Sequence, residues 1–307
     1  MIFIYKLREF DTPLEMEFDK LFALALRNQS HNGDLLLIHE NGFYDSDTHI
    51  FNKHSEEKFN PHAIGPGNEG HSEYTHYLFI DKYRQSNIHE LGFKEYLKLY
   101  EYSDEREKEI DDLQKMEGLG IQLEMLIYIK IWEADLFIKK LYEFVRILHR
   151  EHYDWYFKLK ESSRSLNFSG ERHEIIRSKI RDKIQDISPL LFETIKRSYK
   201  TQIRNSIAHS NYSFLGRSIH LNNFVEGDPH SQIRVVTFNE WTDIFHQTLS
   251  LYDQYIRLDN LIQNYYKQIA ENNNNKVEIL VTEENGKAYP TYLSYDLNIK
   301  RWFYESK

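Results

Sequence analysis

An arginine and a histidine stand five positions apart near the end of a predicted helix, with an asparagine directly after the arginine. Residues 204–209 read Arg-Asn-Ser-Ile-Ala-His. His209 could move a proton near neutral pH, since histidine is the side chain that ordinarily titrates there. Arg204 could neutralise the charge that builds on a phosphorane, and Asn205 could orient the phosphate or the histidine. RNA carries its own nucleophile, the 2′-hydroxyl, so this trio could cleave a phosphodiester without a metal.

A capped helix is expected to position these three residues. Ser188-Pro189 has the form of an N-cap followed by proline at the first helical position, which predicts one helix from Pro189 to about His209. Asn205 and His209 are four residues apart and would share a face of it. A β-hairpin with arms at 218–221 and 232–236 is expected next. A capping box at Thr237–Glu240 then opens a helix that ends near Glu271.

The motif and its setting resemble the HEPN superfamily, in which an Arg-x(4–6)-His signature, often with asparagine after the arginine, lies in a helical bundle. The resemblance covers residues 119–271. It implies a mainly α fold, a HEPN-type helical bundle with a β-hairpin after the motif helix, and a metal-independent endoribonuclease. One histidine per chain supplies only one proton-transfer group, and a two-fold dimer would bring two together. The expected state is therefore a homodimer with a composite site at the dimer cleft, as in HEPN ribonucleases.

Three consecutive parts are expected along the chain. Residues 1–118 form a mixed α/β region with a recognition or regulatory role, 119–271 form the HEPN-like domain, and 272–307 form a linker and a C-terminal β-hairpin. The expected elements outside the motif region are strands at 1–7 and 34–39, a helix at 15–26, a loop at 52–76, surface helices at 87–113, a central helix at 119–157, a break at 162–170 and a helix at 172–187.

Several residues near the motif are candidates for substrate binding. Lys196, Arg197 and Lys200 precede it on the same predicted helix and could bind phosphates, although a solvated basic face explains them equally well. Tyr199 and Tyr212 could stack on a base. Glu133 lies in an otherwise apolar stretch, where a buried acid needs a partner, and Arg204 is a conceivable one.

Other readings of the same residues stay open. His209 could serve only as a cation at a helix C-terminus, with Arg204 paired to a surface acid. Two further arginine–histidine pairs, Arg84/His89 and Arg146/His152, show that the spacing alone is not decisive. Degenerate HEPN domains share the fold, so the alternative function is a non-catalytic module that binds a nucleotide, an RNA or a protein partner.

A metal-dependent hydrolase is a third reading. Eight of the 15 histidines fall early in the chain, accompanied by acids: His31, His39, His49, His54, His62, His71, His76 and His89. None has the close helical pairing of a zinc motif, so the preferred interpretation assigns no metal and no cofactor. The sequence also lacks a phosphate-binding glycine loop, a Gly-x-Ser-x-Gly elbow and a dinucleotide fingerprint.

The composition of the chain limits the compartments and the kinds of partner to be expected. The chain has no cysteine, which fits a reducing cytoplasm, and no signal-peptide layout at its start. Charges interrupt its most apolar segment, 119–148, so no membrane span is expected. The net charge of −9 disfavours broad coating of nucleic acid, yet residues 171–217 hold ten Lys or Arg against five acids. The expected partners are RNA (tRNA among the candidates), a second copy of the chain, and an antitoxin or other regulatory protein in a toxin or phage-defence setting.

Overall fold

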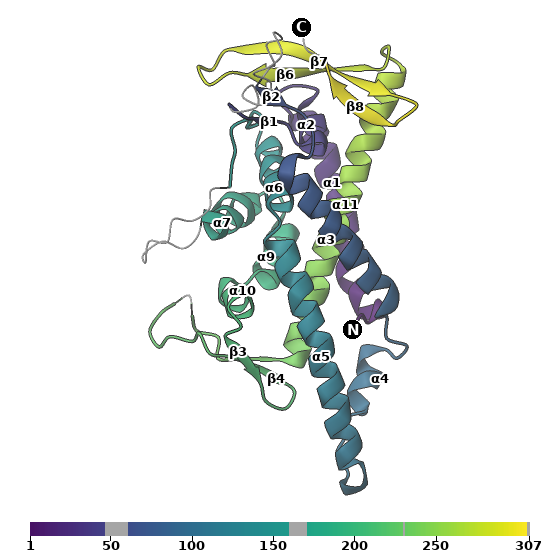
Figure 1. Ribbon diagram of the computed structural model, residues 1–307, viewed down its shortest axis with the longest axis vertical. Coiled ribbons are helices and arrows are strands. Elements are labelled where there is room, and N and C mark those ends of the chain that lie inside the picture. The colour runs from purple at the N-terminus through teal and green to yellow at the C-terminus, as the bar shows by residue number, and fades with distance from the viewer. Residues whose placement is uncertain (47–60, 160–170, 230, 306–307) are drawn as a thin grey trace, which may run out of the picture. The chain divides into compact units, whose positions relative to one another are not determined.

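Helices dominate the protein in the computed structural model, which describes residues 1–46, 61–159, 171–229 and 231–305 (Figure 1). The mainly α class is confirmed. The α-helices are α1 (Ile4–Asn28), α2 (Asp34–Glu40), α3 (Gly67–Ser86), α4 (Phe93–Lys98), α5 (Glu107–Trp132), α6 (Asp135–Leu148), α7 (Glu171–Glu174), α8 (Asp182–Ile184), α9 (Pro189–Ser198), α10 (Thr201–Ala208) and α11 (Phe238–Glu271). A 3-10 turn, η1 (Asp104–Arg106), precedes α5, and a π-helical stretch, η2 (Ile175–Arg181), joins α7 to α8.

The strands form small antiparallel sheets. They are β1 (Phe43–Tyr44), β2 (His62–Ala63), β3 (Tyr212–Phe214), β4 (Ser218–Leu221), β5 (Val235–Thr237), β6 (Lys276–Thr282), β7 (Ala288–Asp296) and β8 (Arg301–Tyr304). The sheets are β1-β2, β3-β4-β5 and β6-β7-β8. Both expected hairpins are present, and each gains a third strand: β3 pairs with β4 after the motif, and β8 pairs with β7 near the C-terminus.

The chain builds two compact units that are interleaved in the sequence. The first comprises 1–17, 74–134 and 188–254, and the second comprises 18–73, 135–187 and 255–307. Helices α1, α3 and α11 each contribute residues to both units. The expected boundaries near residues 118 and 271 are therefore not boundaries of these units, and the motif lies in the first unit together with α5.

Large aromatic side chains fill the core of the first unit. Tyr128 and Trp132 of α5 are fully buried, and so is Trp241 of α11. The Tyr128 and Trp241 rings lie 5.6 Å apart, and the Trp132 ring lies 4.9 Å from Tyr199. Each such ring buries a large apolar area, so α5 is held firmly along the face that it turns toward α10 and α11.

The expected central helix at 119–157 is wrong in two respects. It begins earlier, at Glu107, and it is two helices, because α5 ends at Trp132 and α6 starts at Asp135. Glu133 closes α5 with φ −104° and ψ −5°. An apolar pattern that continues through the break does not reveal it, since buried apolar residues lie on both sides of the junction.

The expected single helix from Pro189 to His209 is also wrong. The predicted cap is confirmed, because the Ser188 hydroxyl accepts a hydrogen bond from the Leu191 N–H at 3.2 Å. However, α9 ends at Ser198, and Tyr199 is extended at φ −95° and ψ 112°. Tyr199 buries its ring on Trp132, and the Lys200 N–H donates to the Tyr128 hydroxyl at 3.2 Å. Tertiary packing thus overrides local helix propensity at this point.

The region before residue 118 is more helical than expected. The expected strand at 34–39 is helix α2, which starts where the His31 N–H donates to the Asp34 carboxylate and stops at left-handed Asn41. The expected strand at 1–7 is mostly α1. Of the expected loop at 52–76, residues 67–76 belong to α3, while 52–60 lie outside the described residues, as does the whole of the expected break at 162–170.

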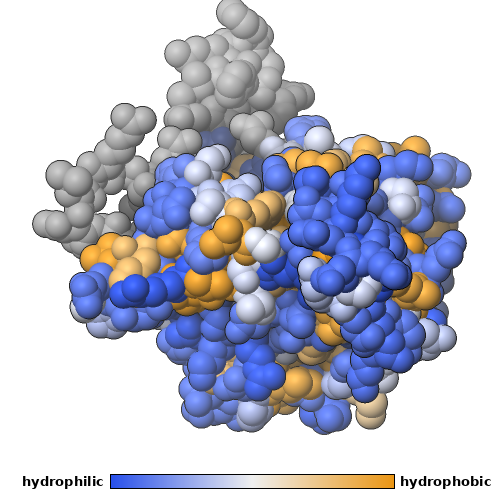
Figure 2. Space-filling model, turned by 90° about the horizontal axis from the view of Figure 1, so that it is seen from below, coloured by the Kyte–Doolittle hydropathy of each residue, from blue (hydrophilic) through white to orange (hydrophobic). Residues whose placement is uncertain are grey.

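Along the described part of the chain, every helix is too short or too polar to cross a bilayer. The face seen in Figure 2 is mostly hydrophilic, with hydrophobic patches between the polar side chains. Single exposed apolar residues are ordinary on a protein surface. A candidate contact surface is therefore identified by how exposed apolar residues line up, and their number says less.

The capping box that opens α11 gives a direct stability test. The Glu240 N–H donates to the Thr237 hydroxyl at 3.2 Å, and the Thr237 N–H donates to the Glu240 carboxylate at 2.7 Å. We expect Thr237→Ala to lower the free energy of unfolding by about 1 kcal/mol, measured by urea denaturation. Thr237→Ser keeps the hydroxyl and is the matched control. Equal stability of the two variants would contradict the role of the cap.

Candidate functional site

Helix α10 carries the motif and places it against the end of α5. The Arg204 side chain is 17% exposed, and its Nε donates to a carboxylate oxygen of Glu133, which is 25% exposed. Arg204 Nη1 also donates to the Asn205 side-chain oxygen at 2.7 Å. The expected Glu133–Arg204 pair is therefore present, and the guanidinium is held between a carboxylate and an amide.

The end of α10 presents His209 to solvent. His209 is the last residue of the helical path, at φ −104° and ψ 9°, and its N–H donates to the Asn205 carbonyl at 3.1 Å. The chain then reverses through Ser210, whose φ of 52° is left-handed. The next residue, Asn211, returns its N–H to the Ser206 carbonyl at 2.7 Å. This hydrogen-bonded turn fixes the backbone of His209 at the end of α10, and the His209 side chain is exposed.

Two side-chain contacts that the sequence did not reveal hold the segments around α10. The Gln202 amide donates to the Ile233 carbonyl and accepts from the Ile233 N–H, both at 2.8 Å, and thereby ties the chain before β5 to α10. Arg217, just before β4, makes two hydrogen bonds to the Glu117 carboxylate of α5, at 2.7 and 2.8 Å. Glu117 is an acid on the buried face of α5, and such a position was the one available signal that a cationic partner would be needed.

The other predicted binding residues differ in what they can offer a ligand. Tyr199 is buried against Trp132, so its ring cannot stack on a base as proposed from sequence. Arg197 is exposed, with its Nε 3.6 Å from Glu193. Lys200 is half-buried at the start of α10, and Tyr212 is half-buried in β3 with its ring 5.7 Å from Phe214. Of these four, Arg197 leaves its side chain most open to solvent.

The two other arginine–histidine pairs have structural roles. Arg84 pairs with Asp253 at 2.6 Å, while His89 packs its ring 4.9 Å from Tyr96. Arg146 donates to the His152 backbone carbonyl at 2.8 Å. Neither pair combines a hydrogen-bonded arginine–asparagine couple with an exposed histidine, which distinguishes the 204–209 segment.

The early histidines are dispersed. His31 lies 3.3 Å from Glu278, His39 lies 3.0 Å from Asp259, and the His62 ring lies 3.2 Å from the Thr282 carbonyl. His49 and His54 lie outside the described residues. Within the described ranges, histidine and acidic side chains do not gather in a group of three or more that could hold a metal ion.

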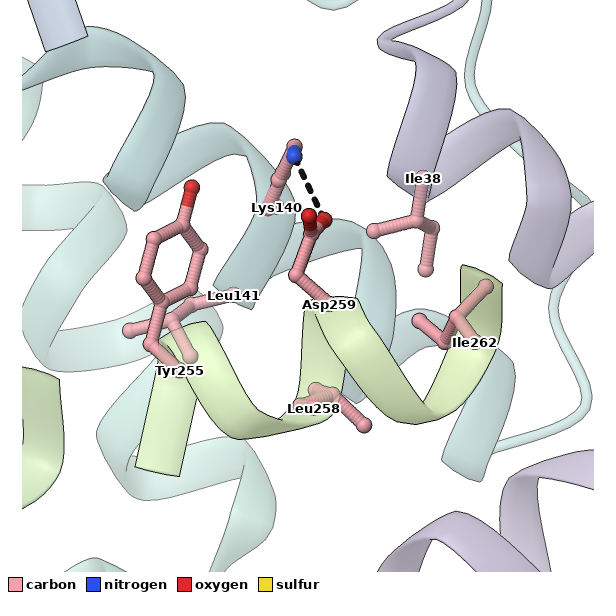
Figure 3. A pocket seen from close by; sticks show the side chains of 7 residues that line it. All are labelled: Ile38, Lys140, Leu141, Tyr255, Leu258, Asp259 and Ile262. Carbon is pink, nitrogen blue, oxygen red and sulfur yellow. Dashed lines mark hydrogen bonds and ion pairs between the residues drawn. The ribbon is translucent and has the colours of Figure 1, made fainter. Parts of the chain in front are cut away.

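A second cluster of charges lies inside the other unit (Figure 3). Lys140 of α6 points to Asp259 of α11, with Nζ 2.7 Å from the carboxylate, and His39 approaches the other carboxylate oxygen at 3.0 Å. Ile38, Leu141 and Leu258 are among the apolar side chains around them. The cavity here is about 10 Å³, at the lower limit for a single water molecule. The cluster therefore has no room for a substrate, and we treat it as structural.

Burial and neighbouring charges shift the pKa of Asp259 in opposite directions. Burial alone raises the pKa of the Asp259 carboxyl, but the Lys140 ammonium and the His39 ring hold that pKa well below its ordinary value. Burial likewise acts to lower the pKa of Lys140, and nearby carboxylates, above all Asp259 and then Glu73, reverse that shift and raise it. The ionised pair is thus the stable form in the folded protein at neutral pH.

Comparison of the chain with protein-family models, with curated proteins and with solved structures finds no match. The functional argument therefore depends on the residues and geometry of the site.

Removing the acid of the Lys140–Asp259 pair is expected to have a pH-dependent effect on stability. Asp259→Asn leaves Lys140 charged and buried, so we expect a loss of about 3 kcal/mol in the free energy of unfolding at pH 7. Because the pKa of Asp259 is lower in the folded protein than in the unfolded chain, its contribution is present above pH ~3.9 and declines as the pH falls below that value. Urea unfolding at pH 7 and pH 3.5 should therefore show the difference shrinking. Asp186→Asn, at an exposed position, should change stability by less than about 0.5 kcal/mol.

Proposed function

We propose that the protein is a metal-independent endoribonuclease of the HEPN type that acts as a homodimer. One observation carries the proposal: Arg204, held by Glu133 and Asn205 in the middle of α10, is followed five residues later by exposed His209 at the end of the same helix. Cleavage by an internal 2′-hydroxyl needs a positioned cation and a proton-transfer group, and this short segment supplies both. The motif's resemblance to HEPN ribonucleases supports the same reading.

In the proposed reaction the 2′-oxygen of RNA attacks the adjacent phosphorus as a base removes its proton. The bond from the 2′-oxygen to phosphorus forms, and the bond from phosphorus to the 5′-oxygen breaks with transfer of a proton to that oxygen. Arg204 stabilises the equatorial oxygens of the phosphorane, and Asn205 holds the guanidinium. His209 serves as one proton-transfer group and His209 of a second copy as the other. The products carry a 5′-hydroxyl and a 2′,3′-cyclic phosphate, or a 3′-phosphate where water opens the cyclic phosphate.

The wider setting is part of the proposal. The RNA, with tRNA among the candidates, would reach His209 from solvent, and Arg197, Lys200 and Tyr212 would contact its phosphates or bases. By the resemblance, the protein would act in the cytoplasm as a toxin or phage-defence effector, restrained by an antitoxin or another regulatory partner.

A non-catalytic HEPN module is the second candidate, and a specific observation favours it. The Arg204 guanidinium already has a carboxylate partner in Glu133, and a carboxylate competes with phosphate for the same donors. In this alternative, Arg204 is structural and the surface around His209 binds an RNA, a nucleotide or a protein without turnover.

The first test compares the wild type with His209→Ala on total RNA and tRNA in EDTA. We expect the variant to cleave 10²–10⁴-fold more slowly, because it lacks a proton-transfer group, with an unchanged melting temperature because His209 is exposed. His152→Ala, at another exposed histidine, should cleave like the wild type. Products with a 5′-phosphate and a 3′-hydroxyl, or equal cleavage by His209→Ala, would falsify the mechanism.

Arg204→Lys separates the two candidates. Lysine keeps the charge beside Glu133 but loses the planar fork, so the nuclease reading predicts a fall in kcat of about 10²–10³-fold, with a melting temperature close to that of the wild type. Single-turnover cleavage at saturating RNA measures the effect. Binding that persists with no turnover in either protein would favour the non-catalytic module.

A further inference from the structure

Helix α5 carries a stripe of exposed apolar residues at heptad spacing. Met116, Leu119, Leu123 and Leu126 are 67%, 57%, 46% and 45% exposed. Their spacings of three, four and three residues place them on one line along the helix. The opposite face of α5 carries the buried side chains. The helix is therefore apolar on both sides, and the described residues cover only one of them.

The stripe has an unusual symmetry about residue 121. Leu119 and Leu123 lie two residues on either side of this centre, and Met116 and Leu126 lie five residues on either side. The heptad line continues to Asp112 at one end and to Lys130 at the other, each nine residues from the centre. An inverted copy of the stripe would thus place leucine beside leucine, methionine beside leucine, and aspartate beside lysine.

We infer that this stripe, defined as Asp112, Met116, Leu119, Leu123, Leu126 and Lys130, binds the same stripe of a second copy of the chain in antiparallel orientation. A two-fold contact uses the same surface on both chains, so each residue meets its counterpart across the axis. Asp112 of each copy meets Lys130 of the other. A parallel arrangement would instead place Asp112 beside Asp112, where like charges repel.

The charged ends are able to change partners. Asp112 is exposed and lies 3.4 Å from Lys115, and Lys115 also lies 3.2 Å from Asp111. Lys130 is half-buried, with its Nζ 5.5 Å from the centroid of the Phe79 ring. Exposed pairs within one helix are weak, so they do not prevent Asp112 from meeting a second copy.

A groove of about 240 Å³ extends this surface. It shares Leu119 with the stripe, and Gln122 of α5 and Phe214 and Gly216 beside β3 also line it. Phe214 in turn packs edge-on to Phe238, with ring centroids 5.5 Å apart. The groove gives a second copy a recessed apolar surface beside the stripe, which a single exposed helix face would lack.

The inferred contact goes beyond the proposed ribonuclease and does not depend on it. Glu133 lies twelve residues from residue 121, about 18 Å along a helix, so antiparallel pairing holds the two Glu133 residues about 36 Å apart along the helix axis. The stripe is therefore a different two-fold surface from one that would join two catalytic histidines. A chain with both surfaces would form a closed tetramer or a longer assembly.

The molar mass in solution tests the surface. We expect sedimentation equilibrium or light scattering to show self-association of the wild type, and Leu123→Glu or Met116→Glu to remove one association step. Circular dichroism should show folded variants, since both residues are exposed. Leu297→Glu, at an exposed position in the other unit, should keep the wild-type mass. A monomeric wild type at ~100 μM, or an unchanged mass of the stripe variants, would overturn the inference.

Charge exchange tests the register. Asp112→Lys and Lys130→Asp each place like charges at both ends of the stripe, so each should weaken association roughly tenfold. The double variant restores opposite charges and should recover the wild-type dissociation constant. Failure of the double variant to recover would overturn the inferred register.

Disulfide crosslinking tests the orientation, because the chain has no cysteine of its own. An oxidised mixture of Met116→Cys and Leu126→Cys chains should form a mixed disulfide, since the two positions face each other. Met116→Cys alone should stay uncrosslinked, because its two copies lie about 15 Å apart along the axis. Efficient crosslinking of Met116→Cys alone would indicate parallel helices and overturn the inference. None of these readouts requires RNA cleavage, so the stripe and the proposed activity can fail independently.

Discussion

A half-buried ion pair between Arg204 and Glu133 joins the two helices that carry the candidate site. Glu133 ends α5, and Arg204 occupies the middle of α10, so the pair fixes the short helix relative to the long one. Taking both charges out of water is costly unless they meet and the remaining donors are satisfied. Asn205 satisfies one of those donors, which explains why an asparagine beside the arginine is structurally useful.

The neighbouring breaks in the helices are consistent with this constraint. If α9 and α10 were one straight helix, Tyr199 could not lie extended against Trp132, nor could the Lys200 N–H reach the Tyr128 hydroxyl. The turn at Tyr199 thus redirects α10, and the redirected helix offers Arg204 to the end of α5. A buried aromatic cluster therefore determines the direction of the helix from which His209 projects.

The sequence identified the features that depend on local chemistry. The caps at Ser188 and Thr237 each specify a helix start through one hydroxyl, and both are present. It also suggested Arg204 as the partner of Glu133, because an acid in an apolar stretch needs a cation. The turn at Tyr199 and the helical state of α2 could not be read in this way. An apolar run such as Leu35–Ile38 fits a buried strand or a buried helix equally well, and only contacts distant in sequence decide between them.

Several of the cations among residues 171–217 lie beside carboxylates. Lys196 and Arg197 both lie near Glu193, Lys183 pairs with Glu151, and Arg217 pairs with Glu117. Paired cations release few counterions when a nucleic acid binds, so such binding would depend only weakly on salt. In the proposed function, an RNA ligand would therefore be selected mainly by the shape and hydrogen bonds of the site around Arg204 and His209, and less by long-range attraction. This agrees with the negative net charge of the whole chain. In the proposed function, the few side chains that α10 holds in place would account for both recognition and chemistry.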